Sequence, residues 1–311
     1  MNFDSPWWLP GGHLQTIVPS LLAPPRVPLR RERWDTPDGD FIDVDFCGDP
    51  GAEPQLVLFH GLEGGSDSHY ARSIAAHALA GGWRLAIPHF RGCSGELNRK
   101  PRAYHSGDSE EIDWVLRGFG APVHVIGVSL GGNAMLKWLG ERGAEARSVV
   151  RRAAAVSAPI DLSAAGNALD RGLNRLVYTR HFLSTLKPKS LARLGLFPGI
   201  YDAAQVRAAR SFRDFDGCVT APLHGFRDTD HYWTSSSSGP YLEHIRVPTL
   251  LLNARNDPFL PEHALLAAAQ KVAPCVVLEF PRTGGHAGFL AGPFPGDHGW
   301  LPRRLFRFLT T

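Results

Sequence analysis

Residues 123–139 read VHVIGVSLGGNAMLKWL: an apolar run, then a serine between glycines, then a helix-like segment. The centre of this stretch has the pattern G-x-S-x-G, in which a strand turns sharply into a helix and exposes the serine hydroxyl. So tight a turn leaves room only for very small residues two positions before and after the serine, here Gly127 and Gly131. Because the pentapeptide alone is common, the flanking strand and helix signals are what favour a nucleophile elbow at Ser129 over a chance turn.

A nucleophilic serine needs a histidine base and an acid that orients it, and in this fold they follow in the order serine, acid, histidine. The strand run 247–254 is followed by Asp257, which Pro258 biases away from helical backbone. The next strand run, 275–280, is followed by a glycine-rich loop that carries His286. Both residues would therefore lie just past the carboxyl end of a strand, and we predict Asp257 as the acid and His286 as the base.

Other residues could fill the two roles. His263 and His298 also follow Asp257 in a chain that has 14 histidines. Asp228 and Asp230 are alternative acids, although they precede the strand run instead of following it.

The tetrahedral intermediate of such a reaction needs two backbone N–H donors for its oxyanion. One is expected from Leu130, the residue after the serine. The other is expected from the glycine-rich loop HGLEGG, residues 60–65, which follows the strand run 55–59, and Leu62 is the predicted donor. His60 and Gly61 of this loop are predicted to border the substrate pocket.

Short motifs occur along nearly the whole chain. They are HLQT (13–16), DGDF (38–41), HGLEG (60–64), HFRGCSG (89–95), YHSG (104–107), GVSLGGN (127–133), RDFD (213–216), DPF (257–259) and GGHAGF (284–289). Together they resemble the YheT-like α/β-hydrolases, a group that includes animal abhydrolase-domain lipid hydrolases. The resemblance implies an esterase-type enzyme with the triad Ser129, Asp257 and His286. Tyr232-Trp233 stands where the family tends to carry paired tyrosines, and this pair is expected to line the acyl pocket.

Apolar strand runs alternate with helix-like segments along most of the chain. The continuously apolar runs are 55–59, 83–88, 123–128 and 153–157. They indicate an α/β fold, the α/β-hydrolase fold, with a mostly parallel sheet covered by helices on both faces. Residues 30–36 and 41–47 are predicted to form an antiparallel hairpin. We expect one domain, residues 1–311, with a helical lid inserted at residues 161–246.

The predicted lid contains a basic stretch, residues 171–193, without an acidic side chain. Its apolar residues interleave with the basic ones at roughly helical spacing. One interpretation is a cap helix with a solvated basic face. The other is a lid that contacts an anionic membrane surface or phospholipid head groups, which would place the protein at the inner face of the membrane.

Three other segments have simpler interpretations. Residues 13–16 are predicted to be an N-terminal strap packed on the domain. Asp108, with Glu111 three residues later, is typical of a helix capping box. Residues 91–95 are predicted to be a turn after a strand, in which Cys93 is a conceivable reactive thiol without an evident base.

The composition is that of a globular protein, with 43% hydrophobic and 20% charged residues. A net charge of +3 is too small to indicate a nucleic-acid partner. The four cysteines form neither a C-x-x-C pair nor a metal-like cluster, so we expect free thiols and neither metal nor cofactor. The start of the chain lacks signal-peptide features and no apolar run approaches a membrane-spanning length, so a cytoplasmic location is expected.

The sequence thus predicts a serine carboxylic-ester hydrolase that acts on a small-molecule ester or lipid through a Ser-His-Asp triad and an acyl-enzyme. Three alternatives stay open: a phospholipase on membrane lipids, an amidase or peptidase on the same triad, and a non-catalytic binding module on the same fold. Acyl chain length is not predicted, because the pocket is expected to be built from the inserted segment. Oligomeric state is not predicted either.

Overall fold

The computed structural model describes residues 3–52 and 55–311. Its centre is an eight-stranded sheet in the order β1-β2-β4-β3-β5-β6-β7-β8. The strands are β1 (Arg30–Asp35), β2 (Phe41–Cys47), β3 (Gln55–Phe59), β4 (Arg84–Pro88), β5 (Val123–Val128), β6 (Val150–Val156), β7 (Thr249–Leu252) and β8 (Val276–Glu279). β1 and β2 form the predicted antiparallel hairpin, and β2 also runs antiparallel to β4. All pairs from β4 to β8 are parallel, as the apolar runs predicted.

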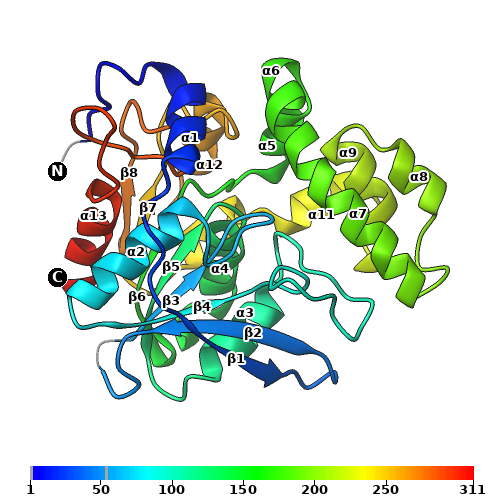
Figure 1. Cartoon of the computed structure of the whole chain (residues 1–311), viewed down its shortest axis with the longest axis horizontal. Coiled ribbons are helices and arrows are strands. Elements are labelled where there is room, and N and C mark those ends of the chain that lie inside the picture. The colour runs from blue at the N-terminus through cyan, green and yellow to red at the C-terminus, as the bar shows by residue number, and fades with distance from the viewer. Residues whose placement is uncertain (1–2, 53–54) are drawn as a thin grey trace.

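Helices cover both faces of the sheet (Figure 1). Those of the sheet-containing body are α1 (Gly11–Leu21), α2 (His69–Ala80), α3 (Ser109–Arg117), α4 (Leu130–Arg142), the 3-10 turn η1 (Glu145–Ser148), α12 (Glu262–Ala268) and α13 (Trp300–Thr310). α2 and α13 share one apolar core with the strands, whereas α3, α4 and α12 pack into a second core on the opposite face. Because the central strands are buried on both faces, their sequences are continuously apolar instead of alternating.

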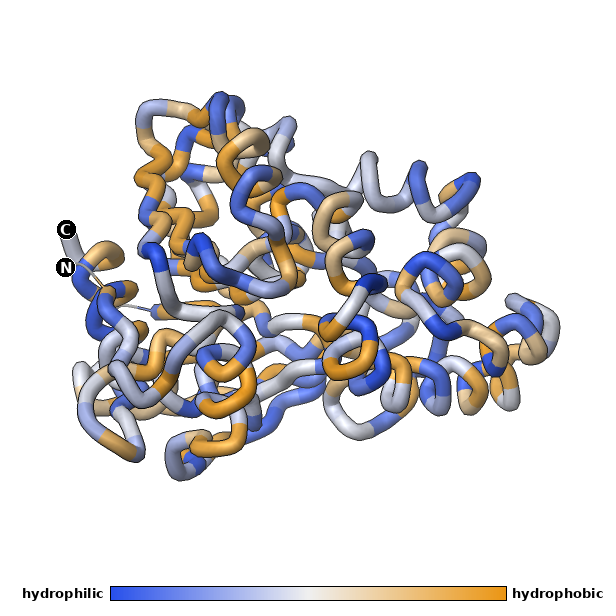
Figure 2. Tube along the Cα trace, turned by 90° about the horizontal axis from the view of Figure 1, so that it is seen from above, coloured by the Kyte–Doolittle hydropathy of each residue, from blue (hydrophilic) through white to orange (hydrophobic). Residues whose placement is uncertain are grey.

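The connection between β6 and β7 is long and helical. It contains α5 (Leu162–Leu169), α6 (Gly172–Asn174), η2 (Arg175–Thr179), α7 (Arg180–Leu196), α8 (Ala203–Ala208), α9 (Phe212–Phe215), η3 (Asp216–Thr220), α10 (Ala221–Leu223), α11 (Thr229–Ser236) and η4 (Gly239–His244). Much of it extends to the right of the sheet in Figure 1. In Figure 2, apolar and polar segments alternate there, whereas apolar segments gather in the sheet-containing body. The predicted insertion, 161–246, lies within this connection, and its role as a lid stays a prediction.

α4 begins at Leu130, directly after Ser129. Only half of the predicted capping box forms: Asp108 accepts a hydrogen bond from the Glu111 backbone N–H at 3.4 Å, but the Glu111 carboxylate turns away to an arginine. Within residues 3–52 and 55–311, no helix has both the length and the apolar character to cross a membrane.

Candidate active site

Ser129 occupies the tip of the turn between β5 and α4. Its backbone has φ 53° and ψ −121°, a conformation that costs a non-glycine residue about 1–3 kcal/mol. A Cβ atom on Gly127 would lie 2.6 Å from the Gly131 carbonyl oxygen, and one on Gly131 would lie 2.5 Å from the His60 carbonyl oxygen. The two glycines are therefore sterically required, and the turn has the backbone of a nucleophile elbow.

Ser129, His286 and Asp257 meet at the carboxyl ends of the strands. His286 Nε2 lies 2.9 Å from Ser129 Oγ, and His286 Nδ1 lies 2.8 Å from Asp257 Oδ2. The second Asp257 oxygen accepts a hydrogen bond from the Phe259 backbone N–H at 2.8 Å. The Phe259 ring also stacks on the His286 imidazole, with centroids 3.9 Å apart. The acid is thus held by a backbone donor, and the imidazole is held between the acid and an aromatic face.

The alternative candidates lie elsewhere. His298 bonds to the carbonyl oxygen of Leu22, and His263 lies in the first turn of α12. Asp228 caps the start of α11, and Asp230 pairs with an exposed arginine of the inserted segment. None of them forms the contacts with Ser129 that His286 forms or the contacts with His286 that Asp257 forms.

Leu62 and Leu130 line the same pocket as Ser129. In the described part of the chain the backbone N–H of neither residue has a hydrogen-bond acceptor. The flanking N–H groups all donate to protein oxygen atoms: those of Gly61, Glu63, Ser129 and Gly131. In these two turns, the N–H groups of Leu62 and Leu130 are therefore the ones without an acceptor, and they are the two predicted to bind an oxyanion.

Glu63, the residue after Leu62, is fastened to the inserted segment. Its carboxylate accepts a hydrogen bond from the Tyr104 hydroxyl at 2.9 Å and pairs with Lys189 Nζ of α7 at 3.0 Å. Its backbone N–H donates to the same Tyr104 hydroxyl at 3.0 Å. The loop beside Leu62 is thus held by the Tyr104 hydroxyl and, through Lys189, contacts α7.

The loop that carries His286 is held by four side chains. Four consecutive backbone N–H groups donate to side-chain oxygens: Gly284 to Gln15 Oε1, Gly285 to Asn256 Oδ1, His286 to Thr16 Oγ1 and Ala287 to Ser157 Oγ, at 2.9–3.1 Å. Two of the four acceptors belong to α1. The segment predicted as a strap therefore positions the histidine loop, and the sequence signal for this was the adjacent polar pair Gln15-Thr16 in the helix.

α1 lies very close to the loop that carries Asp257 and to the loop that carries His286, and glycine residues make room for these contacts. A Cβ atom on Gly12 would lie 2.0 Å from the Asn256 carbonyl oxygen, and one on Gly288 would lie 1.8 Å from the Gln15 carbonyl oxygen. Gln15 also accepts a hydrogen bond from the Asn256 side chain at 2.8 Å and donates one to the Leu9 carbonyl oxygen at 2.8 Å. α1 thus joins the acid loop to the histidine loop.

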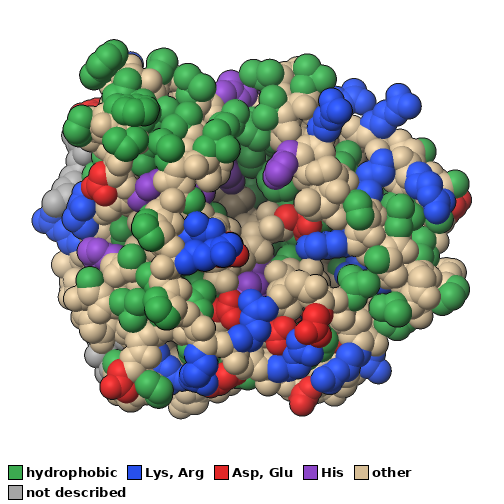
Figure 3. Space-filling view, viewed as in Figure 1, with side chains coloured by type: hydrophobic (Ala, Val, Ile, Leu, Met, Phe, Trp, Pro, Cys, Tyr) green, Lys and Arg blue, Asp and Glu red, His purple; other side chains and the backbone are tan. Residues whose placement is uncertain are grey.

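A pocket opens beside Ser129 and extends under the inserted segment. Much of its wall is apolar: Leu62, Leu162, Ala165, Leu169, Phe182, Leu186, Phe212, Phe215, Val219, Tyr232, Trp233 and Phe259. Figure 3 shows a hollow near the centre of this face, between hydrophobic side chains and a group of charged ones. Tyr232 and Trp233 line the pocket. Gly61, which was predicted to border it, is absent from the pocket wall, although a Cβ on Gly61 would lie 3.1 Å from Ser129 Cβ.

The prediction that His60 borders the pocket is wrong. Its side chain is fully buried and is absent from the pocket wall. His60 Nε2 accepts a hydrogen bond from the Phe90 backbone N–H at 3.1 Å, and burial lowers the pKa of His60 to about 3. It is therefore a neutral residue that supports the loop from behind.

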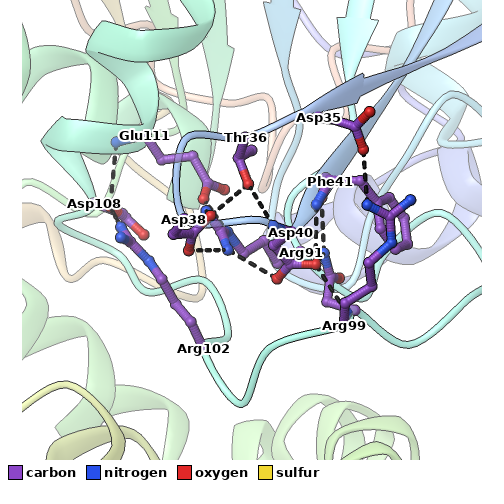
Figure 4. Close-up of polar contacts among 11 residues, drawn as sticks. Asp35, Thr36, Asp38, Asp40, Phe41, Arg91, Arg99, Arg102, Asp108 and Glu111 are labelled. Carbon is purple, nitrogen blue, oxygen red and sulfur yellow. Dashed lines mark hydrogen bonds and ion pairs between the residues drawn. The ribbon is translucent and has the colours of Figure 1, made fainter.

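Arg91 links two of the sequence motifs and α3 in an ion cluster (Figure 4). Its guanidinium donates to Asp38 and Asp40 at 2.8 Å and to Glu111 at 2.6 Å. Burial, together with the nearby charge of Asp108, raises the pKa of Glu111 to about 7. Residues 91–95 are thus more than the predicted turn, because Arg91 joins the β1–β2 hairpin and α3 to the pocket wall.

The interpretation of Cys93 as a reactive thiol is not supported. Burial raises the pKa of its thiol to about 12, which leaves little thiolate at neutral pH. All four cysteines are free. Within the described ranges, no group of three or more histidine, cysteine or acidic side chains is placed to hold a metal ion.

Comparison with known proteins identifies the family. A family model described as alpha/beta hydrolase fold matches residues 54–293. YheT of Escherichia coli (strain K12), provisionally named an esterase, is 38% identical, and the match covers 96% of this chain and 90% of that protein. Phospholipase ABHD3 of Mus musculus is 31% identical over 95% of this chain and 75% of its own length.

Solved structures share the fold at low sequence identity. The esterase EaEST from Exiguobacterium antarcticum superimposes with a TM-score of 0.59 at 17% identity and covers 91% of this chain and 100% of its own. The carboxylesterase CesB from Bacillus subtilis gives a TM-score of 0.57 at 18% identity and covers 91% of this chain and 92% of its own. These findings confirm the predicted fold class and resemblance: the chain belongs to the α/β-hydrolase family and to its YheT-like group.

Proposed function

We propose that the protein is a serine carboxylic-ester hydrolase that works through Ser129, His286 and Asp257. The observation that carries this proposal is the unbroken chain of hydrogen bonds from Ser129 Oγ through both imidazole nitrogens to Asp257, at 2.9 and 2.8 Å. Such an arrangement is how a neutral hydroxyl becomes a nucleophile near pH 7.

In the proposed reaction Ser129 Oγ attacks the ester carbonyl carbon while His286 Nε2 takes the hydroxyl proton. Asp257 holds the imidazole through Nδ1 and stabilises the imidazolium that forms. The oxyanion is bound by the N–H groups of Leu62 and Leu130. The intermediate collapses, His286 gives its proton to the leaving alkoxide, and a seryl ester remains on Ser129. A water molecule, deprotonated by His286, then releases the carboxylic acid and restores the serine.

A lipid or other apolar ester is the substrate class that the pocket favours. The relatives support this, since one is named a phospholipase and another is provisionally named an esterase. Aromatic and aliphatic side chains of the inserted segment surround the space next to Ser129. This composition suits an acyl chain, because its burial is favourable in proportion to the apolar area removed from water. A phospholipase is therefore the main alternative within the same reaction class.

The inserted segment, residues 161–246, is proposed to act as the lid of this pocket. Phe182 and Leu186 of α7, with Trp233 of α11, belong to the pocket wall. The ion pair between Lys189 and Glu63 fastens α7 to the loop of the catalytic body. An extra wall of this kind excludes water from the reaction and sets which acyl chain fits.

Contact with a membrane is a second proposal, which rests on the outer surface of this segment. Leu173 and Leu176 expose 54% and 69% of their surface beside the exposed Arg175 and Arg180. Exposed leucines next to arginines are typical of surfaces that bind anionic lipid. The basic stretch is not one continuous face, however, because the side chain of Lys189 turns into the pocket. Binding to anionic vesicles should fall in Arg175→Glu/Arg180→Glu, and unchanged sedimentation with vesicles would exclude this contact.

Labelling with a fluorophosphonate probe tests the proposed enzyme most directly. Wild-type protein should be labelled, and Ser129→Ala should remain folded and unlabelled. Matched ester and amide substrates then separate an esterase from an amidase or peptidase, since the same triad could serve both. A folded wild type that neither takes up the probe nor cleaves any ester would contradict the proposal and would favour a binding module.

A further inference from the structure

One stripe of α7 faces the pocket and changes in character along its length. The stripe consists of Phe182, Leu186, Lys189, Ser190 and Arg193, all of which line the pocket. Its first residue lies at the reactive end, because the Phe182 ring is 6.2 Å from the Phe259 ring that stacks on His286. At about 1.5 Å per helical residue, Arg193 lies roughly 16 Å further along the helix. The stripe therefore leads from an apolar reactive end to a cationic far end.

Arg193 differs from the other cations of the pocket. Arg91 is bonded to three carboxylates and Lys189 is paired with Glu63. Arg193 is 94% buried, since only 6% of its surface is exposed, and its side chain lines the pocket. Among residues 3–52 and 55–311 its guanidinium has neither a hydrogen-bond partner nor an ion-pair partner. Arg193 Nη2 rests 3.5 Å from the position that a Cβ on Gly92 would take. A buried charge without a partner is costly, so this guanidinium is expected to have a partner that the described residues do not provide.

His224 offers a second open polar group in the same pocket. Its Nε2 atom is buried and makes no hydrogen bond within the described part of the chain. Burial, the neighbouring His105 and, more weakly, the charge of Arg193 lower the pKa of His224 to about 3, so the imidazole is neutral. A neutral imidazole can donate one N–H. Its unpartnered nitrogen is an observation independent of Arg193, and as an N–H donor it would suit the same kind of ligand.

We propose that Arg193, assisted by His224, binds an anionic group of the substrate, so that the natural ester carries a carboxylate or phosphate at the end remote from the scissile bond. The inference rests on the proposed function, because it assigns the substrate class of that same site. The apolar stretch between the two ends, lined by Phe182 and Leu186, fits the chain that would connect ester and anion. A planar guanidinium suits either oxyanion, because its parallel N–H groups match two oxygens at once.

The test uses binding rather than turnover. Ser129→Ala is titrated calorimetrically with n-alkyl phosphates and alkanoates from hexyl to dodecyl, below their micelle concentrations. The uncharged controls are n-alkanols of the same lengths. Charged ligands of the fitting length should bind roughly tenfold to a hundredfold more tightly than the matched alcohol, as expected for charge-assisted hydrogen bonds. In Ser129→Ala/Arg193→Gln this preference should disappear, whereas it should persist in Ser129→Ala/Arg307→Gln, which removes an exposed arginine of α13.

Other results of these titrations would contradict the anion site or separate it from the proposed hydrolase. Equal binding of charged and uncharged ligands, or a preference that survives Arg193→Gln, overturns the proposal. If inorganic phosphate binds as tightly as the alkyl phosphates, the site takes a free anion and the inference about substrate is wrong. If Arg193→Gln does not fold, Arg193→Lys replaces it and should lower the preference for charged over uncharged ligands. In the wild type, alkyl phosphates should then compete with fluorophosphonate labelling more strongly than alkanols do. A charged-ligand preference in a protein that the probe never labels would sustain the anion site and reject the proposed hydrolase.

Discussion

The backbone N–H of His286 donates a hydrogen bond to the hydroxyl of Thr16 at 2.9 Å, although the two residues are 270 positions apart in the chain. Thr16 belongs to α1, and its hydroxyl also donates to the Gly12 carbonyl oxygen at 2.7 Å. The orientation of the candidate base therefore depends directly on a helix near the start of the chain.

Replacing Thr16 with valine should lower kcat by roughly tenfold to a hundredfold with little change in KM. Valine has a similar shape but no oxygen, so the His286 N–H loses its acceptor and the imidazole is less well fixed relative to Ser129. Steady-state kinetics on a short ester measures the change, and thermal unfolding checks that the fold is kept. Thr16→Ser keeps the oxygen and should restore most of kcat. Equal activity of the valine and serine variants would contradict a positioning role.

Asp257→Asn should reduce kcat on the order of 10⁴-fold while the protein stays folded, as for the equivalent change in serine proteases. The Phe259 N–H donates to one carboxylate oxygen, so the asparagine carbonyl is expected to take that contact. Its amide N–H groups would then face His286 Nδ1 and stabilise the tautomer that carries the proton on Nε2. Stopped assays with a fluorogenic ester measure the loss. A variant with near-wild-type kcat would show that another acid orients the histidine.

Gly166→Ala should shift substrate preference toward short acyl chains. A Cβ at this position would lie 2.5 Å from the Trp233 indole, which is itself held by a 2.8 Å hydrogen bond to Asp216. The displaced ring must occupy part of the pocket, so kcat/KM for long esters should fall roughly tenfold relative to short ones. Esters of graded length measure the ratio. Gly166→Ala/Trp233→Phe should recover long-chain activity, and an unchanged ratio in Gly166→Ala would mean that the acyl chain lies elsewhere.

Asp216→Asn should make the protein more stable at neutral pH. Burial raises the pKa of Asp216 from its ordinary value to about 6, so the folded protein holds this proton more tightly than the unfolded chain. The wild type therefore loses stability as the pH rises from about 4 to about 6, by up to about 3 kcal/mol. Asparagine does not titrate, and its amide can keep a hydrogen bond to Trp233 and one to Thr220 after the threonine hydroxyl rotates.

Urea denaturation of both proteins between pH 4 and pH 7 measures this effect. The difference in the free energy of unfolding between Asp216→Asn and the wild type should increase through pH 5–6 and level off above about pH 7. A difference that does not vary with pH would indicate that Asp216 ionises in the folded protein as readily as in the unfolded chain.

The sequence predicted the central sheet and the elbow because their signals are local. The apolar runs give the strands, and the small residues around Ser129 give the tight turn. The chain order of serine, acid and histidine pointed to three residues that do meet in space. Their catalytic roles stay a proposal until the variants are measured.

Contacts between distant segments could not be predicted from one sequence. Gln15 and Thr16 looked like ordinary polar residues of a helix, and only the packing of α1 against the histidine loop reveals their bonds. His60 was misjudged because a glycine-rich loop has two sides, and a linear pattern does not say which side a given residue faces. The same holds for Arg193, because only the folded structure shows that no described residue pairs with its guanidinium.

The ion pair between Glu63 and Lys189 has a consequence for the order of events in a catalytic cycle. Glu63 adjoins Leu62, so a displacement of α7 that breaks the pair would remove one contact that holds this loop and leave the two with the Tyr104 hydroxyl. In the proposed reaction, admission of a bulky substrate by such a displacement would leave the Leu62 N–H less firmly positioned for the oxyanion. The return of α7 to the loop would then restore the third contact and favour the chemical step.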